Sequence, residues 1–162
     1  GTVLSFTSRT PVAMASVEFL SNLDAPVAAT TTDASGRYST LVPAAGEYLV
    51  RVNGTLNEVA VFRAGGRVDL LYDDSGRCIA RYGVITDART RLPVRGAEVT
   101  LGTTAVTNSD GAYMIELGCP GNPTFGGTTL ISVSHPDYVS FQRVVGRGVS
   151  FVSRLDMALE RD

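Results

Sequence analysis

A single histidine, His135, limits the acid–base and metal chemistry that this sequence can perform. It excludes any site that needs two histidines, and a Ser-His-Asp triad would have to use His135 itself. His135 lies within residues 134–138, SHPDY, a pattern typical of the turn before a strand. Cys119 has no base nearby in the sequence that would activate it as a nucleophile. We therefore expect no catalytic residue and predict that the protein is not an enzyme.

The basic residues add further exclusions, because all 14 are arginine and the sequence has no lysine. A P-loop, a Schiff-base enzyme and a lysine-derived isopeptide crosslink are thereby excluded. Charged residues make up 19% of the chain and the net charge is −2, so no strong field favours nucleic acid or an anionic membrane. No apolar run approaches ~18 residues, the length that crosses a bilayer. We expect no cofactor, no nucleic-acid partner and no membrane insertion.

Two adjacent carboxylates, Asp73 and Asp74, are candidate ligands for Ca²⁺. They begin the polar tetrapeptide DDSG at residues 73–76, which also suits a solvated turn in a short linker. We favour the turn and expect no metal site.

The elements that position these residues belong to an internal repeat. Three sequence blocks occur twice, in the same order, and this order predicts two tandem domains, residues 1–75 and 76–162. Because the linker between them is short, we expect the domains to sit end to end with limited bending. The paired blocks are residues 1–20 with 83–102, 32–38 with 107–113, and 68–70 with 155–157.

Apolar and polar residues alternate within each half, with the period of two that marks strands rather than helices. Valine, threonine, tyrosine and phenylalanine dominate these runs, as strands prefer. We therefore predict an all-β fold of two tandem seven-stranded, Ig-like β-sandwiches. The expected strands lie near 2–6, 14–20, 26–32, 37–42, 46–53, 57–63 and 67–72 in the first half, and near 79–87, 97–102, 103–108, 112–117, 128–134, 138–145 and 149–159 in the second.

The second repeated block ends in Gly-x-Tyr in both halves. Gly36 and Gly111 stand where a tight hairpin needs a positive φ. Tyr38 and Tyr113 follow two residues later, and we expect each ring to point into a core while its hydroxyl reaches a polar partner at the rim.

One loop, residues 118–127 (GCPGNPTFGG), is longer than its counterpart at 43–46. Added length and an aromatic tip are features of recognition loops on β-sandwiches, so Phe125, with Asn122 and Thr124, forms a candidate binding loop. The alternative is that Phe125 folds back over its own core.

Three arginines around Pro93 form a candidate basic patch: Arg89, Arg91 and Arg95. Guanidinium groups suit an acidic glycan or an acidic protein partner. The alternative is an ordinary solvated surface.

The motifs of the second half resemble the carboxypeptidase regulatory-like domain, a transthyretin-like (prealbumin-like) sandwich of seven strands. The matching segments are GVITD at 83–87, PVRGAEV at 93–99 and SDGAY at 109–113. The first half departs from the pattern, because Met14 replaces the usual glycine and Ser35 replaces the aspartate before the turn glycine. The resemblance covers nearly the whole chain as two copies.

This resemblance also implies a disulfide. In a transthyretin-like sandwich the first and fourth strands are antiparallel neighbours, which would place Cys78 beside Cys119. An even cysteine count in a β-rich chain favours an oxidising compartment. We expect a Cys78–Cys119 disulfide, with two separate thiols as the alternative.

Domains of this kind are similar to accessory, binding or spacer modules of secreted and cell-surface proteins. We interpret the chain as a segment or mature product of an extracytoplasmic protein, bacterial because all-arginine usage indicates a GC-rich genome. Its expected role is a non-catalytic structural or adhesion module that makes protein contacts or provides spacing. The alternatives are a carbohydrate-binding module and an accessory domain of a secreted enzyme. A cell-surface polysaccharide is disfavoured by the absence of tryptophan, but four aromatic residues keep it open: Tyr48, Tyr72, Tyr82 and Phe125.

Overall fold

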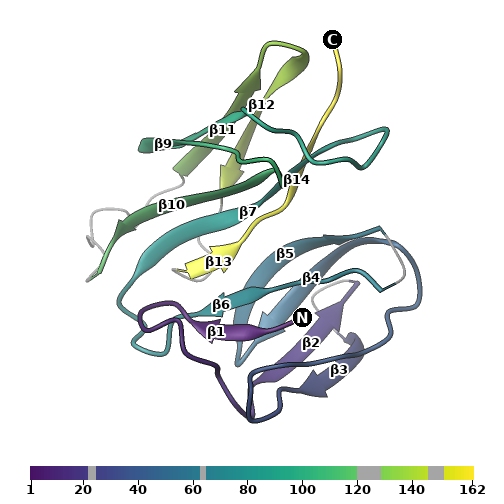
Figure 1. Ribbon diagram of the computed structural model, residues 1–162, viewed down its shortest axis with the longest axis vertical. Coiled ribbons are helices and arrows are strands. Elements are labelled where there is room, and N and C mark those ends of the chain that lie inside the picture. Colours follow the sequence, from purple (N-terminus) through teal and green to yellow (C-terminus); the bar gives the residue numbers. More distant parts are fainter. Residues whose placement is uncertain (22–24, 63–64, 120–128, 146–151) are drawn as a thin grey trace.

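A computed structural model describes residues 1–21, 25–62, 65–119, 129–145 and 152–162. Every regular element in these ranges is a β-strand, which confirms the predicted all-β class (Figure 1). Within the same ranges, no helix is long and apolar enough to cross a membrane. Below, residues 1–75 are called the first half and residues 76–162 the second half.

The first half contains one four-stranded antiparallel sheet in the order β3-β2-β4-β5, and a parallel pair of β1 with β6. Its buried core lies between these two layers and includes Val17, Val50 and Leu70. The strands are β1 (Val3–Ser5), β2 (Ser16–Leu20), β3 (Pro26–Thr31), β4 (Gly46–Val52), β5 (Thr55–Val61) and β6 (Leu70–Tyr72).

The second half repeats this plan with two four-stranded sheets. One has the order β12-β11-β8-β9; the other has the order β10-β7-β13, with β14 also paired with β7. The sheets enclose a second core that includes Ile85, Val99 and Ile131. The strands are β7 (Ile79–Asp87), β8 (Glu98–Leu101), β9 (Thr103–Val106), β10 (Ala112–Gly118), β11 (Thr129–His135), β12 (Tyr138–Val145), β13 (Val152–Arg154) and β14 (Met157–Leu159).

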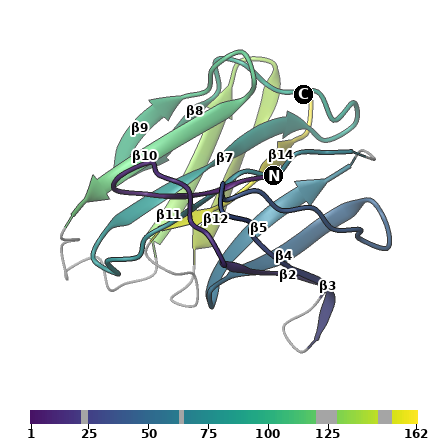
Figure 2. The ribbon, with the colours of Figure 1, turned by 60° about the horizontal axis from the view of Figure 1, so that its bottom comes forward.

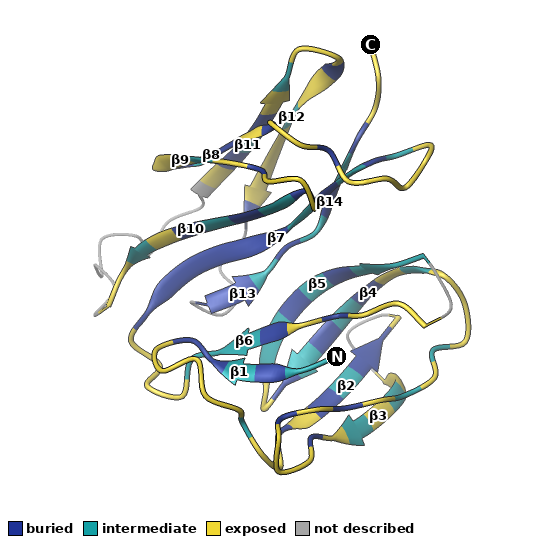
Figure 3. Cartoon of the chain, viewed as in Figure 1, coloured by how far each residue is buried: buried dark blue, intermediate teal, exposed yellow. Residues whose placement is uncertain are grey.

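Burial follows the alternation of the sequence, as Figure 3 shows by the banding of the strands. In β4 the side chains of Tyr48, Val50 and Val52 are buried, while Leu49 and Arg51 between them are half-buried. Alternate residues of a strand point to opposite faces, so one face of β4 packs on the core and the other remains near solvent.

Two strand predictions are wrong. Residues 37–42 form no strand: Arg37 makes an isolated bridge to Thr2, and Tyr38 exchanges two backbone hydrogen bonds with Gly1. The predicted strand 149–159 is two strands, β13 and β14, separated by Leu155 and Asp156. The count of seven strands therefore fails in the described part of each half, which has six strands before residue 76 and eight after it. The first failure has a physical reason, because β10 pairs with Ile79–Val84 of β7, whereas residues 39–42 have no such neighbour among the described residues.

The tyrosine prediction is confirmed in both halves. Tyr38 donates a hydrogen bond from its hydroxyl to the carbonyl oxygen of Val68 (2.6 Å), and Tyr113 donates one to that of Leu155 (2.7 Å). Both rings are buried, and burial raises the pKa of each hydroxyl well above its usual range. Each tyrosine therefore links its hairpin to the last strands of its own half.

The two turn glycines also behave as predicted, with φ of 72° at Gly36 and 70° at Gly111. A Cβ atom at Gly36 would collide with the carbonyl oxygen of Val3, and one at Gly111 with that of Ile85. Glycine is needed at both positions for conformation and for space.

Cys78 and Cys119 form a disulfide, as the sequence resemblance implied. Cys78 lies just before β7 and Cys119 just after β10, and these first and fourth strands of the second half pair antiparallel. The bond closes the end of this strand pair.

Replacement of both cysteines, Cys78→Ser with Cys119→Ser, is expected to lower the free energy of unfolding by about 4 kcal/mol. The reason is that the bond spans 41 positions and restricts the unfolded chain accordingly. Chemical denaturation followed by fluorescence measures the change. Wild-type protein unfolded in the presence of a reductant serves as the control and should match the variant. An unchanged denaturation midpoint would contradict the expectation.

Candidate functional site at the contact between the two halves

The candidate binding loop cannot be placed, because Asn122, Thr124 and Phe125 lie outside the described residues. It stays a prediction.

The candidate basic patch is exposed at all three positions, Arg89, Arg91 and Arg95. Arg91 is held differently from the others, since its guanidinium stacks over the ring of Phe62 in the first half, 4.1 Å from the ring centre. It also lines a cleft of about 220 Å³ together with Arg67 and Arg154, and neither of the other two patch residues lines that cleft. The role of the patch in binding stays a prediction.

His135 and Asp73 have ordinary local contacts. The Nδ1 atom of His135 accepts a hydrogen bond from the backbone of Asp137 (3.2 Å), as in a turn. The Asp73 carboxylate accepts hydrogen bonds from the backbone N–H groups of Ser75 and Cys78. Among the described residues no group of three His, Cys, Asp or Glu side chains is arranged to hold a metal ion.

The two halves meet along their strands, so the expected end-to-end arrangement is wrong. β13 of the second half packs beside β5 and β6 of the first half. Figure 1 shows β13 lying next to β5, and Figure 2 shows the two halves in contact from another direction. β5 is an edge strand of its own sheet, and an uncovered edge carries unpaired N–H and C=O groups.

Backbone groups join β5 to the second half. Glu58 and Leu155 form a parallel bridge, and the backbone N–H of Asp156 donates to the carbonyl oxygen of Glu58 (3.0 Å). The side-chain oxygen of Asn57 accepts a hydrogen bond from the backbone N–H of Arg154 (2.7 Å). Asn57 is fully buried, so its amide serves this contact and not the solvent.

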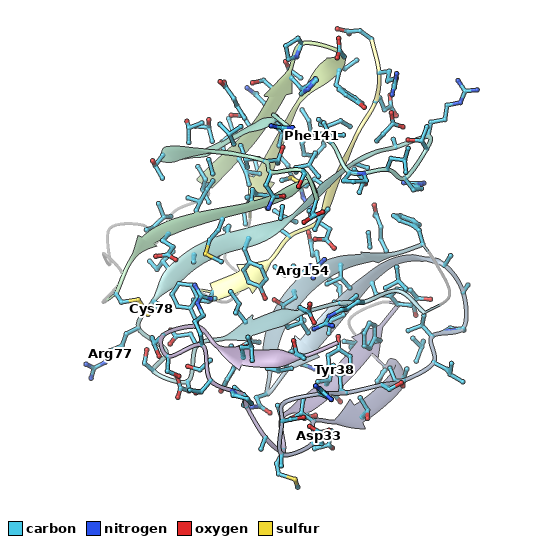
Figure 4. All side chains as sticks on the ribbon, in the orientation of Figure 1. Asp33, Tyr38, Arg77, Cys78, Phe141 and Arg154 are labelled. Carbon is cyan, nitrogen blue, oxygen red and sulfur yellow. A yellow bond between two sulfur atoms is a disulfide. The ribbon has the colours of Figure 1, made fainter. Side chains whose placement is uncertain are left out.

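An ion pair between Arg154 and Asp156 forms the centre of the contact, and Figure 4 shows Arg154 between the two halves. The Nε atom of Arg154 lies 2.9 Å from Oδ1 of Asp156, and the side chains of Arg154 and Asp156 are only 11% and 5% exposed. Asp156 also accepts backbone hydrogen bonds from Ala60 in the first half and from Val84 in the second, both 3.0 Å long. Arg154 donates from Nη1 to the carbonyl oxygen of Asp69 (2.8 Å). Each member of the pair therefore contacts both halves.

The electrostatic balance at this pair favours the charged arginine. Burial alone would lower the pKa of Arg154, but the adjacent carboxylate of Asp156 outweighs that effect and the pKa is raised. A buried charge of this kind is tolerated because it is paired and hydrogen-bonded.

An apolar cluster completes the contact at the linker end. It comprises Phe6 of the first half with Cys78, Ala80, Tyr82 and Val152 of the second half. The hydroxyl of Tyr82 accepts a hydrogen bond from the backbone N–H of Leu71 (2.6 Å), which ties β7 to β6. Burial raises the pKa of Tyr82 above its usual range.

A groove of about 400 Å³ opens at another part of the contact, with β4 and β5 on one side and β12 and β14 on the other. Glu58 and Arg143 pair across it at 2.7 Å, with both side chains partly exposed. Phe141 and Glu47 also line it. An exposed pair of this type contributes little to stability.

Comparison with known proteins gives only a loose likeness of architecture. No protein-family model and no curated protein matches the sequence. Among solved structures, the Bacillus anthracis TIE protein is 14% identical with a TM-score of 0.38, over 99% of this chain and 33% of that protein. A double mutant of the shaft pilin SpaA from Lactobacillus rhamnosus GG is 12% identical with a TM-score of 0.36, over 99% of this chain and 96% of that one. The group B streptococcus pilus 2b backbone protein is 10% identical with a TM-score of 0.36, over 99% of this chain and 90% of that one. Likeness at this level does not bear on function.

The role of Arg154 at this site was not predicted from the sequence, nor was Arg67 identified as its counterpart in the first half. The repeated third block contained Asp69 and Asp156, but each follows an arginine two residues earlier, Arg67 and Arg154. The signal was therefore present as Arg-x-Asp in both halves. Arg67 and Asp69 form the equivalent pair at 2.8 Å, yet they are 69% and 49% exposed.

Arg154→Ala is expected to lower the free energy of unfolding by about 3–5 kcal/mol, because it leaves the Asp156 carboxylate buried without its partner. Arg67→Ala is the matched control, since it removes the same residue from the exposed copy of the pair and should cost about 0–1 kcal/mol. Chemical denaturation of both variants measures the difference. Equal losses in the two variants would show that the contact between the halves adds nothing to this pair.

Asp87 is bonded to the C-terminal segment, and its ionisation is expected to make the stability of the protein depend on pH. Its carboxylate accepts hydrogen bonds from the side chain of Arg161 (2.7 Å) and the hydroxyl of Tyr138 (3.1 Å), and from the backbone of Arg89 and Thr90. The Arg161 hydrogen bond, followed by those of the backbone, holds the pKa of Asp87 far below its usual range. Its contribution to stability is therefore present above the unfolded-state pKa and is lost as pH falls toward the folded-state pKa.

Asp87→Asn is accordingly expected to lower the thermal midpoint at pH 7 and to flatten the decline of that midpoint below about pH 4. Thermal unfolding from pH 7 to pH 2 measures both effects. The exposed Asp110→Asn variant is the control for a change of one charge. Parallel curves for wild type and Asp87→Asn would refute the assignment.

Proposed function

We propose that this protein is a non-catalytic structural module that acts as a rigid spacer within a larger extracytoplasmic protein. The buried, hydrogen-bonded contact centred on Arg154 and Asp156 carries the proposal. A flexible pair of domains would need no such contact, because inter-domain surfaces are ordinarily small and polar and allow relative motion. Here the edge of β5 is joined to the second half through backbone hydrogen bonds.

The linker supports the same role. Asp73 begins a turn, and its carboxylate oxygens accept hydrogen bonds from the backbone N–H groups of Ser75 and Cys78. The disulfide begins at Cys78, directly after this turn. A linker restrained at both ends limits bending between the halves, so parts attached to the module are held at a fixed spacing.

The halves are proposed to be tandem carboxypeptidase regulatory-like domains, residues 1–75 and 76–162. Support comes from contacts that recur at equivalent positions. Thr32 donates from its hydroxyl to the carbonyl oxygen of Val12 (2.6 Å), and Thr107 donates to that of Val94 (2.7 Å). The tyrosine hydrogen bonds and the Arg-x-Asp pairs recur in the same way. Duplication of one domain accounts for such pairs.

The proposed location is the outside of a bacterial cell, in a secreted, periplasmic or surface protein. The Cys78–Cys119 disulfide supports an oxidising compartment, where such bonds persist. The bacterial source rests on the all-arginine composition.

The spacer role is preferred to carbohydrate binding because two of the candidate stacking residues are inside the protein. Tyr48 and Tyr82 are both buried, and their hydroxyls are bonded to the backbone of Ala44 and Leu71. Sugar stacking needs an exposed ring face. The accessory-domain alternative is compatible with a rigid module and differs only in what the module holds.

Residual dipolar couplings of the amide groups test the rigid spacer. One alignment tensor is expected to fit both halves of the wild-type protein, because the contact fixes their orientation. In Arg154→Ala the two halves are expected to need separate tensors, while Arg67→Ala should behave as wild type.

If the two halves of the wild-type protein needed separate alignment tensors, the spacer proposal would be wrong. Retardation of the protein during electrophoresis through gels that contain bacterial cell-envelope polysaccharide would instead favour the carbohydrate-binding alternative, and the spacer proposal expects none.

A further inference from the structure

The cleft beside Arg91, called the arginine cleft below, is built jointly by the two halves. Its volume is about 220 Å³, and neither end of the chain lines it. The first half contributes residues 60–62, at the end of β5, and the segment 66–68. The second half contributes Val84 and Thr86 of β7, together with Arg91 and Arg154. Because both halves form its walls, the cleft exists only while they are in contact.

Three guanidinium groups line the arginine cleft, and two of them are already paired with carboxylates. Arg67 lies 2.8 Å from Asp69, and Arg154 lies 2.9 Å from Asp156. In the described part of the chain, no carboxylate lies within ion-pair distance of Arg91. The groups around the cleft therefore carry one positive charge that is not balanced, which favours a ligand with a single negative charge.

The side chain of Arg91 is held in place by Phe62. The centre of its guanidinium lies 4.1 Å from the centre of the Phe62 ring, within the range of a cation–π contact. Its guanidinium N–H groups donate no hydrogen bond to any described residue. A guanidinium offers a planar fork of donors that matches the two oxygens of a carboxylate. Arg91 is thus positioned to bind a carboxylate at the cleft.

The other walls of the cleft are mainly apolar. Val61 and Val68 come from the first half and Val84 from the second, and the Thr86 hydroxyl adds a polar group that no described residue bonds. Apolar walls with a few polar groups are typical of small-molecule sites. Sites for drug-sized ligands measure about 300 Å³ or more, so this cleft suits a smaller molecule.

We propose that the arginine cleft binds a small organic monoacid, a single carboxylate on a short apolar body. The carboxylate pairs with Arg91, and the body packs against Val61, Val68 and Val84. A phosphate monoester fits less well, because it carries about 1.5 to 2 negative charges at neutral pH against one unbalanced positive charge. This binding activity is separate from the spacer role.

Phenylacetate and its neutral amide, phenylacetamide, test the proposal, because they share an apolar body and differ in charge. Each is titrated into the ¹⁵N-labelled protein. Phenylacetate is expected to cause saturable amide shifts at Val61, Val84 and Thr86. Phenylacetamide is expected to bind about tenfold more weakly, since hydrogen bonds between charged groups are the stronger ones. Inorganic phosphate is expected to bind more weakly than phenylacetate.

Two variants locate the charge that binds the acid. Arg91→Asn removes the guanidinium, and asparagine tolerates the positive φ of 61° at this position. It is expected to weaken phenylacetate binding about tenfold and to abolish the preference for phenylacetate over phenylacetamide. Arg95→Asn is the matched control, because Arg95 is equally exposed but does not line the cleft. It should bind both probes as wild type does, and thermal unfolding confirms that both variants are folded.

Several results would overturn the proposal. These are the absence of saturable shifts, shifts confined to residues away from the cleft, equal affinity of wild type for the two probes, and an unchanged preference in Arg91→Asn. An equal loss in Arg95→Asn would show that binding follows only the net charge. Tighter binding of phosphate than of phenylacetate would show that the cleft selects a more highly charged anion, and the monoacid proposal would then fall.

Discussion

The carboxylate of Asp156 is the group on which the arrangement of the two halves depends. It accepts backbone hydrogen bonds from Ala60 and Val84, one from each half, and pairs with Arg154. A buried charge without partners is costly, so the three contacts must form together. This requirement explains why the last strand of the second half is interrupted. Between β13 and β14, Leu155 still donates its N–H to Tyr82 of β7, whereas Asp156 donates its N–H to Glu58 of β5 and accepts the N–H of Val84 on its carboxylate.

The same residue pair has different consequences in the two halves because its surroundings differ. Arg67 and Asp69 hold the start of β1, where the carboxylate accepts hydrogen bonds from the backbone and hydroxyl of Thr2. That copy faces solvent, where ion pairs are weak. Arg154 and Asp156 perform the same local task at Val84 and are then covered by the first half. The same Arg-x-Asp motif thus holds a strand within each half, and in the second half it is also the centre of the contact between the halves.

Local features were predictable from the sequence, and features that depend on contact between distant residues were not. Turn glycines, inward tyrosines and alternating strands follow from short patterns, and the repeat identified equivalent residues such as Tyr38 and Tyr113. The disulfide followed from the family resemblance. The missing strand at 37–42 was mispredicted because the pattern of its residues is compatible with a strand, whereas a strand forms only beside a partner. The site at Arg154 was missed because its burial depends on β5, nearly a hundred positions away.

Edge strands link these observations. An open edge invites unwanted pairing, and proteins usually cover it or interrupt it. The edge of β5 is covered by the second half, whose residues 154–156 accept and donate hydrogen bonds along it. Covering this edge requires the burial of the Arg154–Asp156 ion pair, which is tolerated because both charges are paired and hydrogen-bonded.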